Sequence, residues 1–366
     1  MFHCFAMARP NSHDPSLRCP GRAATSNAAG RFERLQRQYD PGDPGDPGDG
    51  SLRTDVSLEH PRTLITYNRS PDLPFDRSIN PYRGCEHGCI YCFARPTHAW
   101  LGMSPGLDFE SRLIAYPEAA TVLEHELRAA RYRVAPVAIG TNTDPYQPLE
   151  DRYDITRSCL KVLDRFNHPV AVVTKGTLIE RDLDILSDMA ARGLARVGVS
   201  LTTLDPVLSR RMEPRAPSPA RRLQMIERLA GAGVPVRVMT SPLVPGLTDH
   251  EIEGLLMAGQ GAGATAASWI MLRLPLEVSP LFREWLSTHY PDRAARVMAR
   301  VRDMHGGQDY ASDWGHRMRG SGTYAEMIAQ RFDLAAKRLG LDRAQPKLRC
   351  DLFNPPPQKG DQLSLF

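Results

Sequence analysis

The sequence RGCEHGCIYCFARP, residues 83–96, places three cysteines within eight positions, at Cys85, Cys89 and Cys92. The chain has seven cysteines in 366 residues, which is not the pattern of a disulfide framework, so the cluster indicates metal binding or catalysis. Structural zinc sites usually close four positions with two separated ligand pairs, and no second pair follows here. Three ligands with one open position instead suit a 4Fe–4S cluster.

The remaining cysteines do not complete this site. Cys159 falls on the apolar face of a helix-period segment, Cys350 stands alone, and Cys4 and Cys19 lie in a segment with little apolar periodicity. His87 offers an alternative zinc ligand, but its place inside the loop makes reaching the same ion sterically awkward. We therefore interpret the open position as a feature of a catalytic metal centre.

Around this loop, short β-branched runs alternate with segments of helical period. Strands are predicted over 78–84, 136–142, 169–175, 195–201, 234–240 and 267–274, and helices over 117–130, 155–166, 180–193, 218–233 and 249–259. The runs are nearly all apolar, as expected of parallel strands covered on both faces. Six such units predict an α/β fold, a partial (βα)6 TIM-like barrel with its chemistry at the carboxyl ends of the strands.

Composition divides the chain into a folded middle and two polar ends. Residues 1–55 contain the repeat PGDPGDPGDG and are predicted to be disordered, whereas residues 70–290 form the barrel. Residues 291–345 are predicted to form a short α-helical extension, and residues 346–366 a flexible tail. No apolar stretch is long enough to cross a bilayer and no secretory signal is visible, so we expect a cytoplasmic protein without a membrane partner.

The spacing C-x3-C-x2-C, with the aromatic Tyr91 before its last cysteine, resembles the radical S-adenosylmethionine (SAM) superfamily, over roughly residues 75–290. The resemblance implies a 4Fe–4S cluster on Cys85, Cys89 and Cys92, with SAM bound at the open iron. One electron then cleaves SAM to methionine and a 5′-deoxyadenosyl radical, which abstracts hydrogen from a substrate. It also implies a reductase or flavodoxin-type electron donor, and it makes Tyr91 a candidate catalytic residue.

The resemblance places the SAM contacts on polar segments that follow the strands. In GTNTDPYQPLE the candidates for the SAM amino group are Thr141, Asn142, Thr143 and Asp144, because carboxylate and hydroxyl oxygens bind an ammonium group. An Asx turn before Pro145 explains Asp144 equally well.

Two further candidates stand at later strand ends. Lys175 in VTKG is a candidate partner of the SAM carboxylate, with an exposed lysine as the alternative. Ser200 matches a position that touches ribose or carboxylate in the family, although a serine there also serves as a cap.

Four motifs together resemble a branch related to spore photoproduct lyase, a DNA-repair enzyme: INPYRGCEHGCIYC, GTNTDPYQPLE, VTKG and SPLVPGLTD. Two positions depart from that lyase, because Thr141 replaces a hydrogen-donating cysteine and Phe93 replaces a tyrosine, so the same reaction is not implied. The branch favours a nucleic-acid substrate, which a net charge of +4 permits without requiring it. The alternatives are RNA, a peptide or a small molecule.

The sequence QLSLF, residues 362–366, resembles the pentapeptide with which bacterial repair and replication proteins bind the DNA sliding clamp. Gln362 would hydrogen-bond at the clamp groove, while Leu363, Leu365 and Phe366 fill apolar pockets. The alternative is a tail that folds back on its own barrel. A rival interpretation of the whole chain is a non-catalytic interaction protein, stabilised by zinc or a cluster, that binds the clamp.

Overall fold

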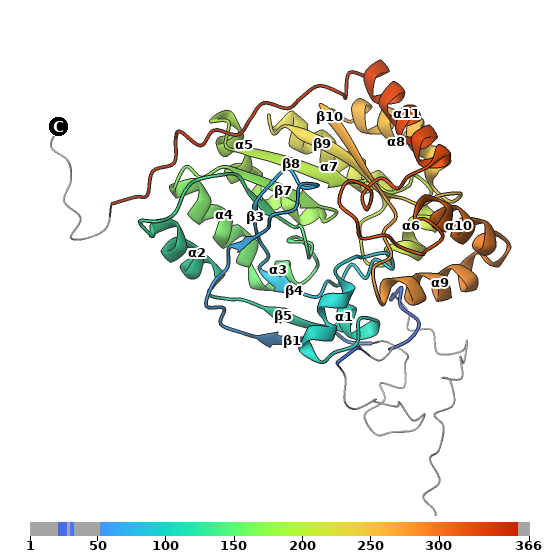
Figure 1. The fold of residues 1–366 in the computed structure, drawn as a ribbon. Helices are drawn as coiled ribbons and strands as arrows, with labels where there is room; N and C mark the ends of the chain where they lie inside the picture. The colour runs from blue at the N-terminus through green and yellow to red at the C-terminus, as the bar shows by residue number, and fades with distance from the viewer. Residues whose placement is uncertain (1–20, 28–29, 33–51, 358–366) are drawn as a thin grey trace, which may run out of the picture.

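The computed structural model describes residues 21–27, 30–32 and 52–357, and its centre is a seven-stranded sheet in the order β10-β9-β8-β7-β6-β3-β2. Each neighbouring pair is parallel except β2 with β3, so six strands follow one another in chain order, as predicted for a partial barrel (Figure 1). The strands are β2 (Thr66–Tyr67), β3 (Arg77–Ile79), β6 (Val137–Ile139), β7 (Val170–Thr174), β8 (Ala195–Ser200), β9 (Val236–Leu243) and β10 (Ala266–Met271).

Helices cover the outer face of the sheet, close to the segments predicted from helical periodicity. They are α2 (Ala119–Arg128), α4 (Ile155–Arg165), α5 (Leu183–Ala191), α7 (Pro219–Gly231) and α8 (Ile252–Gly261), with 3-10 turns leading into α5 and α8. The sequence pattern missed the short helices α1 (Leu107–Ser111), α3 (Glu150–Tyr153) and α6 (Pro206–Met212), because two turns or fewer do not establish a period.

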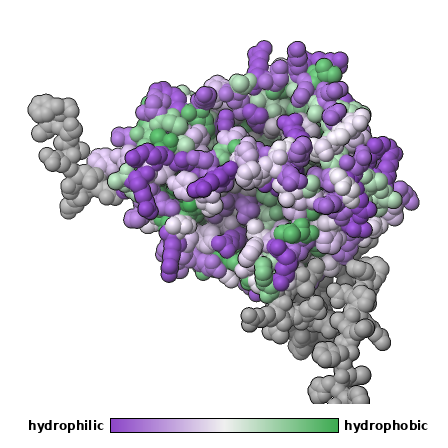
Figure 2. Space-filling view, in the orientation of Figure 1, coloured by the Kyte–Doolittle hydropathy of each residue, from purple (hydrophilic) through white to green (hydrophobic). Residues whose placement is uncertain are grey.

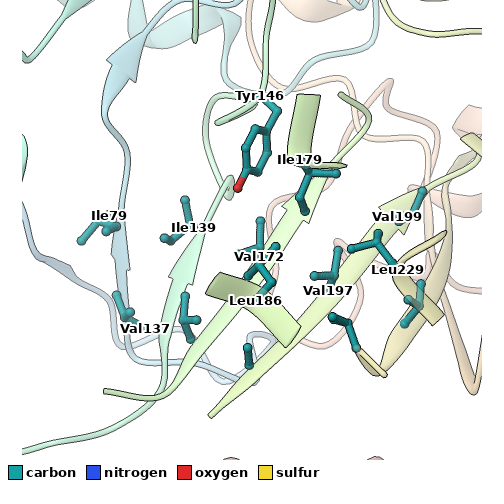
Figure 3. Close-up of a cluster of buried hydrophobic side chains, with 14 of the residues drawn as sticks. Ile79, Val137, Ile139, Tyr146, Val172, Ile179, Leu186, Val197, Val199 and Leu229 are labelled. Carbon is teal, nitrogen blue, oxygen red and sulfur yellow. The ribbon is translucent and has the colours of Figure 1, made fainter. Parts of the chain in front are cut away.

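The hydrophobic core lies between the strands and these helices. Ile79, Ile139, Val172, Val197 and Val199 come from four neighbouring strands, and each is at most 1% exposed. Figure 3 shows these side chains in a row across the sheet, with Ile179, Leu186 and Leu229 packed beside them. The β-branched runs are therefore buried on the barrel, as their continuous apolar character predicted.

The prediction of a single strand over residues 78–84 is wrong. β3 pairs with β6 in the barrel, whereas β4 (Tyr82–Arg83) pairs with β5 (Arg112–Ala115) in a separate sheet of order β1-β5-β4, where β1 is Asp55–Leu58. Pro81 lies between the two strands and has no amide hydrogen to donate, so a continuous ladder is interrupted there.

Three helices follow the barrel: α9 (Val278–His289), α10 (Pro291–Met304) and α11 (Thr323–Arg338). The extension predicted over 291–345 contains α10 and α11, but α9 already begins inside the segment predicted as barrel. Buried residues of α9 and α10 share an apolar cluster with Cys89, Ile90 and Tyr91, so these helices pack near the cysteine loop.

Both polar ends hold ordered contacts that composition did not reveal. Residues 21–27 lie in the segment predicted to be disordered, yet Ala23 and Ala24 are buried, and the hydroxyls of Thr25 and Ser26 donate to Glu284 at 2.5 and 3.0 Å. Their small side chains carry no apolar period that would signal this burial, and their hydrogen bonds reach a residue far along the chain.

The described part of the predicted flexible tail also lies on the barrel. Phe353 stacks edge-on against His168, with ring centroids 5.4 Å apart, and the Asn354 amide donates to the Phe166 carbonyl at 3.0 Å. The Phe353 ring thus helps to fix a Pro-rich segment that composition alone presents as a spacer. Figure 1 shows the chain running along the barrel from α11 to this segment. The QLSLF pentapeptide lies outside the described residues.

Within the described residues, no helix has the length and apolar character needed to cross a membrane. Figure 2 shows hydrophilic side chains over most of the visible face, with apolar residues in small, separated patches.

Candidate functional site

The cysteine loop, residues 84–95, follows β4 and folds through tight turns. The Gly88 amide donates to the Cys85 carbonyl at 3.2 Å, and the Cys92 amide donates to the Cys89 carbonyl at 3.1 Å. Cys85 and Cys89 are buried, Cys92 is half-buried, and all three are free thiols. The three predicted ligands therefore share one folded loop.

The chemistry of these donors fits an iron–sulfur cluster. Burial raises the pKa of the thiols of Cys85, Cys89 and Cys92, that of Cys89 to about 12. Bound iron would reverse this effect, because a coordinating thiol is stabilised as the thiolate. Among the described residues, no three Cys, His, Asp or Glu side chains are grouped so as to hold a metal ion. Such a grouping is needed when several side chains bind one shared ion. A cubane does not require it, because each cysteine binds a different iron.

A fully buried ion pair fixes the path of the loop. Arg95 and Glu110, both 0% exposed, form this pair, and the same guanidinium donates to the carbonyls of Gly88 and Cys89 at 3.0 Å. Gly88 has a φ of +64°, and a Cβ there would lie 2.6 Å from a Glu110 carboxylate oxygen. Glycine is therefore required where the loop passes the ion pair.

Glu110 also receives the N-terminal segment. The amides of Ala23 and Ala24 donate to its two carboxylate oxygens at 3.2 and 3.1 Å. One buried carboxylate thus joins residues 21–27 to the cysteine loop. Buried carboxylates are stable only when such donors surround them.

A second buried carboxylate, Glu213, holds the loop from the segment that follows α6. The Tyr91 hydroxyl donates to it, Arg222 forms an ion pair with it, and the Thr202 hydroxyl donates to it at 3.1 Å. Burial opposes its charge, but Arg222 and Lys175 outweigh that effect and lower its pKa. The hydroxyl of Tyr91, the predicted catalytic residue, is thus engaged in an internal hydrogen bond, and its catalytic role stays a prediction.

Gln147 joins the segment after β6 to the same loop. It is fully buried, its Oε1 accepts from the Glu86 amide at 2.8 Å, and its Nε2 donates to the Gly84 carbonyl at 3.3 Å. These bonds place the TNTD sequence, residues 141–144, beside the cysteines. This agrees with the predicted location of the site at the carboxyl ends of the barrel strands.

Asp144 is surrounded by donors of the protein itself. It accepts from the Thr174 hydroxyl at 2.6 Å and from the amides of Lys175 and Tyr146 at 2.7 and 2.9 Å, and His87 Nδ1 lies 3.3 Å away. Although burial opposes its charge, His87, Thr174 and Lys175 hold its pKa well below the usual range. The bond from Tyr146 is the Asx turn named as the alternative, so the structure supports that interpretation.

The other predicted SAM contacts divide into two groups. The Thr143 hydroxyl donates to a β4 carbonyl at 3.0 Å, and the Ser200 hydroxyl donates to a β9 carbonyl at 3.2 Å. In contrast, Thr141 and Asn142 are half-buried, and among the described residues their side chains make no hydrogen bond. These two side chains are therefore free to bind a ligand.

Lys175, predicted to pair with the SAM carboxylate, also lies beside the loop. Its Nζ is 5.8 Å from the centroid of the Tyr91 ring. Burial opposes its charge, but Cys89 and Glu213 outweigh that effect and raise its pKa. The lysine is therefore a charged group next to the predicted cluster ligands.

Sequence reasoning missed the residues that hold the loop: Arg95, Glu110, Gln147, Glu213 and Arg222. Gln147 offered a weak signal, since it adjoins a proline in a polar segment that follows a strand. Glu213, at the end of α6, offered none. Glu110 offered none, because it stands in a five-residue helix.

Comparison with known proteins agrees with this geometry. The family model described as the radical SAM superfamily matches residues 79–258, a segment that includes the cysteine loop and the barrel to α8. Residues 79–258 thus form a radical SAM domain. Radical SAM proteins as a family carry a 4Fe–4S cluster and bind SAM.

Two relatives have names that assign no activity. An uncharacterized protein of Mycobacterium tuberculosis is 40% identical over 226 residues, which cover 61% of this radical SAM chain and 66% of that protein. The chain thus spans slightly less than two thirds of that relative. An uncharacterized protein of Methanocaldococcus jannaschii is 25% identical over 214 residues, or 58% of this chain and 76% of the other.

Spore photoproduct lyase shares the fold of this radical SAM protein. Its complex with dinucleoside spore photoproduct aligns with a TM-score of 0.55 and 16% identity, over 78% of this chain and 79% of the lyase. A lyase mutant with bound AdoMet and the same photoproduct aligns with a TM-score of 0.53 and 14% identity, over the same fractions. At these identities the similarity concerns the fold.

Proposed function

We propose that the chain is a radical SAM enzyme in which Cys85, Cys89 and Cys92 hold a 4Fe–4S cluster. The observation that carries this proposal is the cysteine loop itself, fixed by two buried carboxylates inside the segment that matches the family model. When bound and reduced, the cluster supplies the electron that cleaves SAM to methionine and a 5′-deoxyadenosyl radical. A reductase or flavodoxin-type protein is the proposed electron donor.

The side chains around the loop have distinct tasks in this proposal. Thr141 and Asn142 offer unoccupied hydroxyl and amide groups to the SAM amino group at the end of β6. Lys175 offers a positive charge to the SAM carboxylate. Asp144 and Glu213 keep the strand ends and the loop in place.

We propose nucleic acid as the substrate class. The support is the fold shared with a lyase solved in complex with a dinucleoside photoproduct, together with the predicted clamp motif. In the motif resemblance, Thr141 and Phe93 replace a cysteine and a tyrosine of that lyase, so the same reaction is not implied. A peptide or small-molecule substrate would leave the radical chemistry of this proposal intact.

The first test uses anaerobically reconstituted protein. We expect about four irons and four sulfides per chain, and formation of 5′-deoxyadenosine on addition of SAM and dithionite. Cys89→Ala should lose both, whereas Cys350→Ser, which alters a half-buried cysteine of the tail, should keep both. Zinc in place of iron, or a cluster that leaves SAM intact, would contradict the proposal and favour the non-catalytic interaction protein.

We also propose that residues 362–366 bind the DNA sliding clamp. The Phe353 contact holds the start of the tail on the barrel, and binding of the motif to the clamp would raise the local concentration of the enzyme at DNA. Phe366→Ala should abolish pull-down of the clamp, because it removes the largest apolar group of the motif. Gln358→Ala, outside the motif, is the matched control. Equal pull-down by wild type and Phe366→Ala would contradict this partner.

A further inference from the structure

The segment 305–322, between α10 and α11, connects the two edges of the open barrel. The Met271 amide of β10 donates to the Met318 carbonyl at 2.9 Å. On the other side, Arg317 Nε donates to Asp72, in the loop between β2 and β3, at 2.5 Å, and the Gly315 amide donates to Asp72 at 2.8 Å. We call this segment the strap. It lies against the carboxyl end of β10, where barrel chemistry is located.

Arg273 stands at this end of β10, between the strap and the cysteine loop. Its Nη2 donates to the Tyr310 hydroxyl at 3.0 Å and its Nη1 lies 3.5 Å from the Met318 sulfur. Its Cζ is 5.1 Å from the centroid of the Phe93 ring, and Phe93 directly follows the predicted cluster ligand Cys92. The guanidinium is therefore close to the proposed reaction centre.

Arg273 forms no ion pair in the described part of the chain. Asp72 lies near enough to interact with its charge, but that carboxylate is already bound by Gly315 and Arg317. The Arg273 Nε is buried without a hydrogen-bond partner, and its two remaining nitrogens meet only a hydroxyl and a thioether. The fully buried Arg95 and Arg222, by contrast, each form an ion pair with a carboxylate. A partly desolvated guanidinium with no carboxylate in direct contact is costly, so the arrangement suits an anion that arrives with a ligand.

The chemistry beside Arg273 narrows the class of anion. A guanidinium binds phosphate through two parallel hydrogen bonds. Phe93 is 46% exposed, and an exposed aromatic ring at a binding site is a surface on which a nucleobase stacks. We propose that Arg273 binds a phosphate and Phe93 a base of one nucleotide unit of the substrate. This inference rests on the proposed function and specifies its substrate contacts.

The competing explanation is that Arg273 only secures the strap through Tyr310 and Met318. Tyr310→Phe and Met318→Leu separate the two ideas, because they remove the strap partners and leave the guanidinium in place. If Arg273 binds phosphate, both variants retain nucleotide binding. If it only secures the strap, both weaken binding as much as loss of Arg273 does.

The test measures binding of a fluorescein-labelled single-stranded oligodeoxynucleotide of about ten nucleotides to the reconstituted enzyme by anisotropy. Arg273→Gln should weaken binding about tenfold and lower the slope of log Kd against log salt by about one. Arg273→Lys should recover part of the affinity, and Phe93→Leu should weaken binding several-fold while Phe93→Tyr does not. Arg331→Gln, whose ion pair with Glu253 lies between α11 and α8, is the matched control.

Melting temperatures of all variants verify that each is folded. Equal affinity and an unchanged salt slope for Arg273→Gln would overturn the inference and leave the radical chemistry intact. An enzyme that forms 5′-deoxyadenosine but binds neither DNA nor RNA oligonucleotides would overturn both the inference and the nucleic-acid substrate. Absence of 5′-deoxyadenosine with normal oligonucleotide binding would overturn the proposed function alone.

Discussion

Arg95→Met is expected to lower the free energy of unfolding by about 3–5 kcal/mol, the range for breaking a buried ion pair from one side. Among the described residues, the variant leaves the buried Glu110 carboxylate with the amides of Ala23 and Ala24 as its remaining partners. It also removes the donors to the Gly88 and Cys89 carbonyls, which shape the cysteine loop. Urea unfolding at fixed pH measures the first effect, and iron content after reconstitution measures the second, which we expect to fall to background.

The control for Arg95 is an arginine whose ion pair is more exposed. Arg331→Met removes the pair with Glu253 and should change stability by less than about 1 kcal/mol, with normal iron content. Glu110→Gln keeps an oxygen acceptor, so its loss of stability should lie between those of Arg95→Met and Arg331→Met. Wild-type stability and iron content in Arg95→Met would show that the ion pair does not maintain the loop.

Outside the cysteines, Glu213→Gln should cause the second largest loss of folding stability. It leaves Arg222 without its counter-charge at a site that is 1% exposed, so we expect a loss of about 3 kcal/mol or more. The Tyr91 and Thr202 hydroxyls lose a charged acceptor at the same time. We expect a lower melting temperature and, in protein that retains iron, an altered electron paramagnetic resonance spectrum of the reduced cluster.

Tyr91→Phe separates a positioning role of Tyr91 from a catalytic one. Glu213 keeps Arg222 and Thr202 in this variant, so the loss of stability should be about 1.5–3 kcal/mol, the value of one hydrogen bond to a charged group. Retained 5′-deoxyadenosine formation would support positioning of the loop by the hydroxyl. Full iron content with abolished 5′-deoxyadenosine formation would instead support the predicted catalytic role, and would contradict a purely structural Tyr91–Glu213 contact.

The cysteine spacing and the alternation of strands and helices along the chain follow from the sequence, because both are local properties. Cys85, Cys89 and Cys92 lie on one short loop whatever surrounds them. A β-branched run such as 195–201 is apolar at nearly every position, and only a strand covered on both faces buries such a run. Helices of ten residues or more repeat their apolar positions often enough to be recognised, and those of two turns do not.

Which carboxylates hold the loop was decided only by tertiary structure. Glu110 meets the amide of Ala23 across 87 positions, and Tyr91 meets Glu213 across 122. No local pattern marks such a residue, since a charged side chain in a short helix or a Pro-rich turn is ordinarily exposed. Its burial becomes stable only when distant donors surround it. The contact between Arg273 and Phe93, which are far apart in the sequence, likewise exists only in the folded chain.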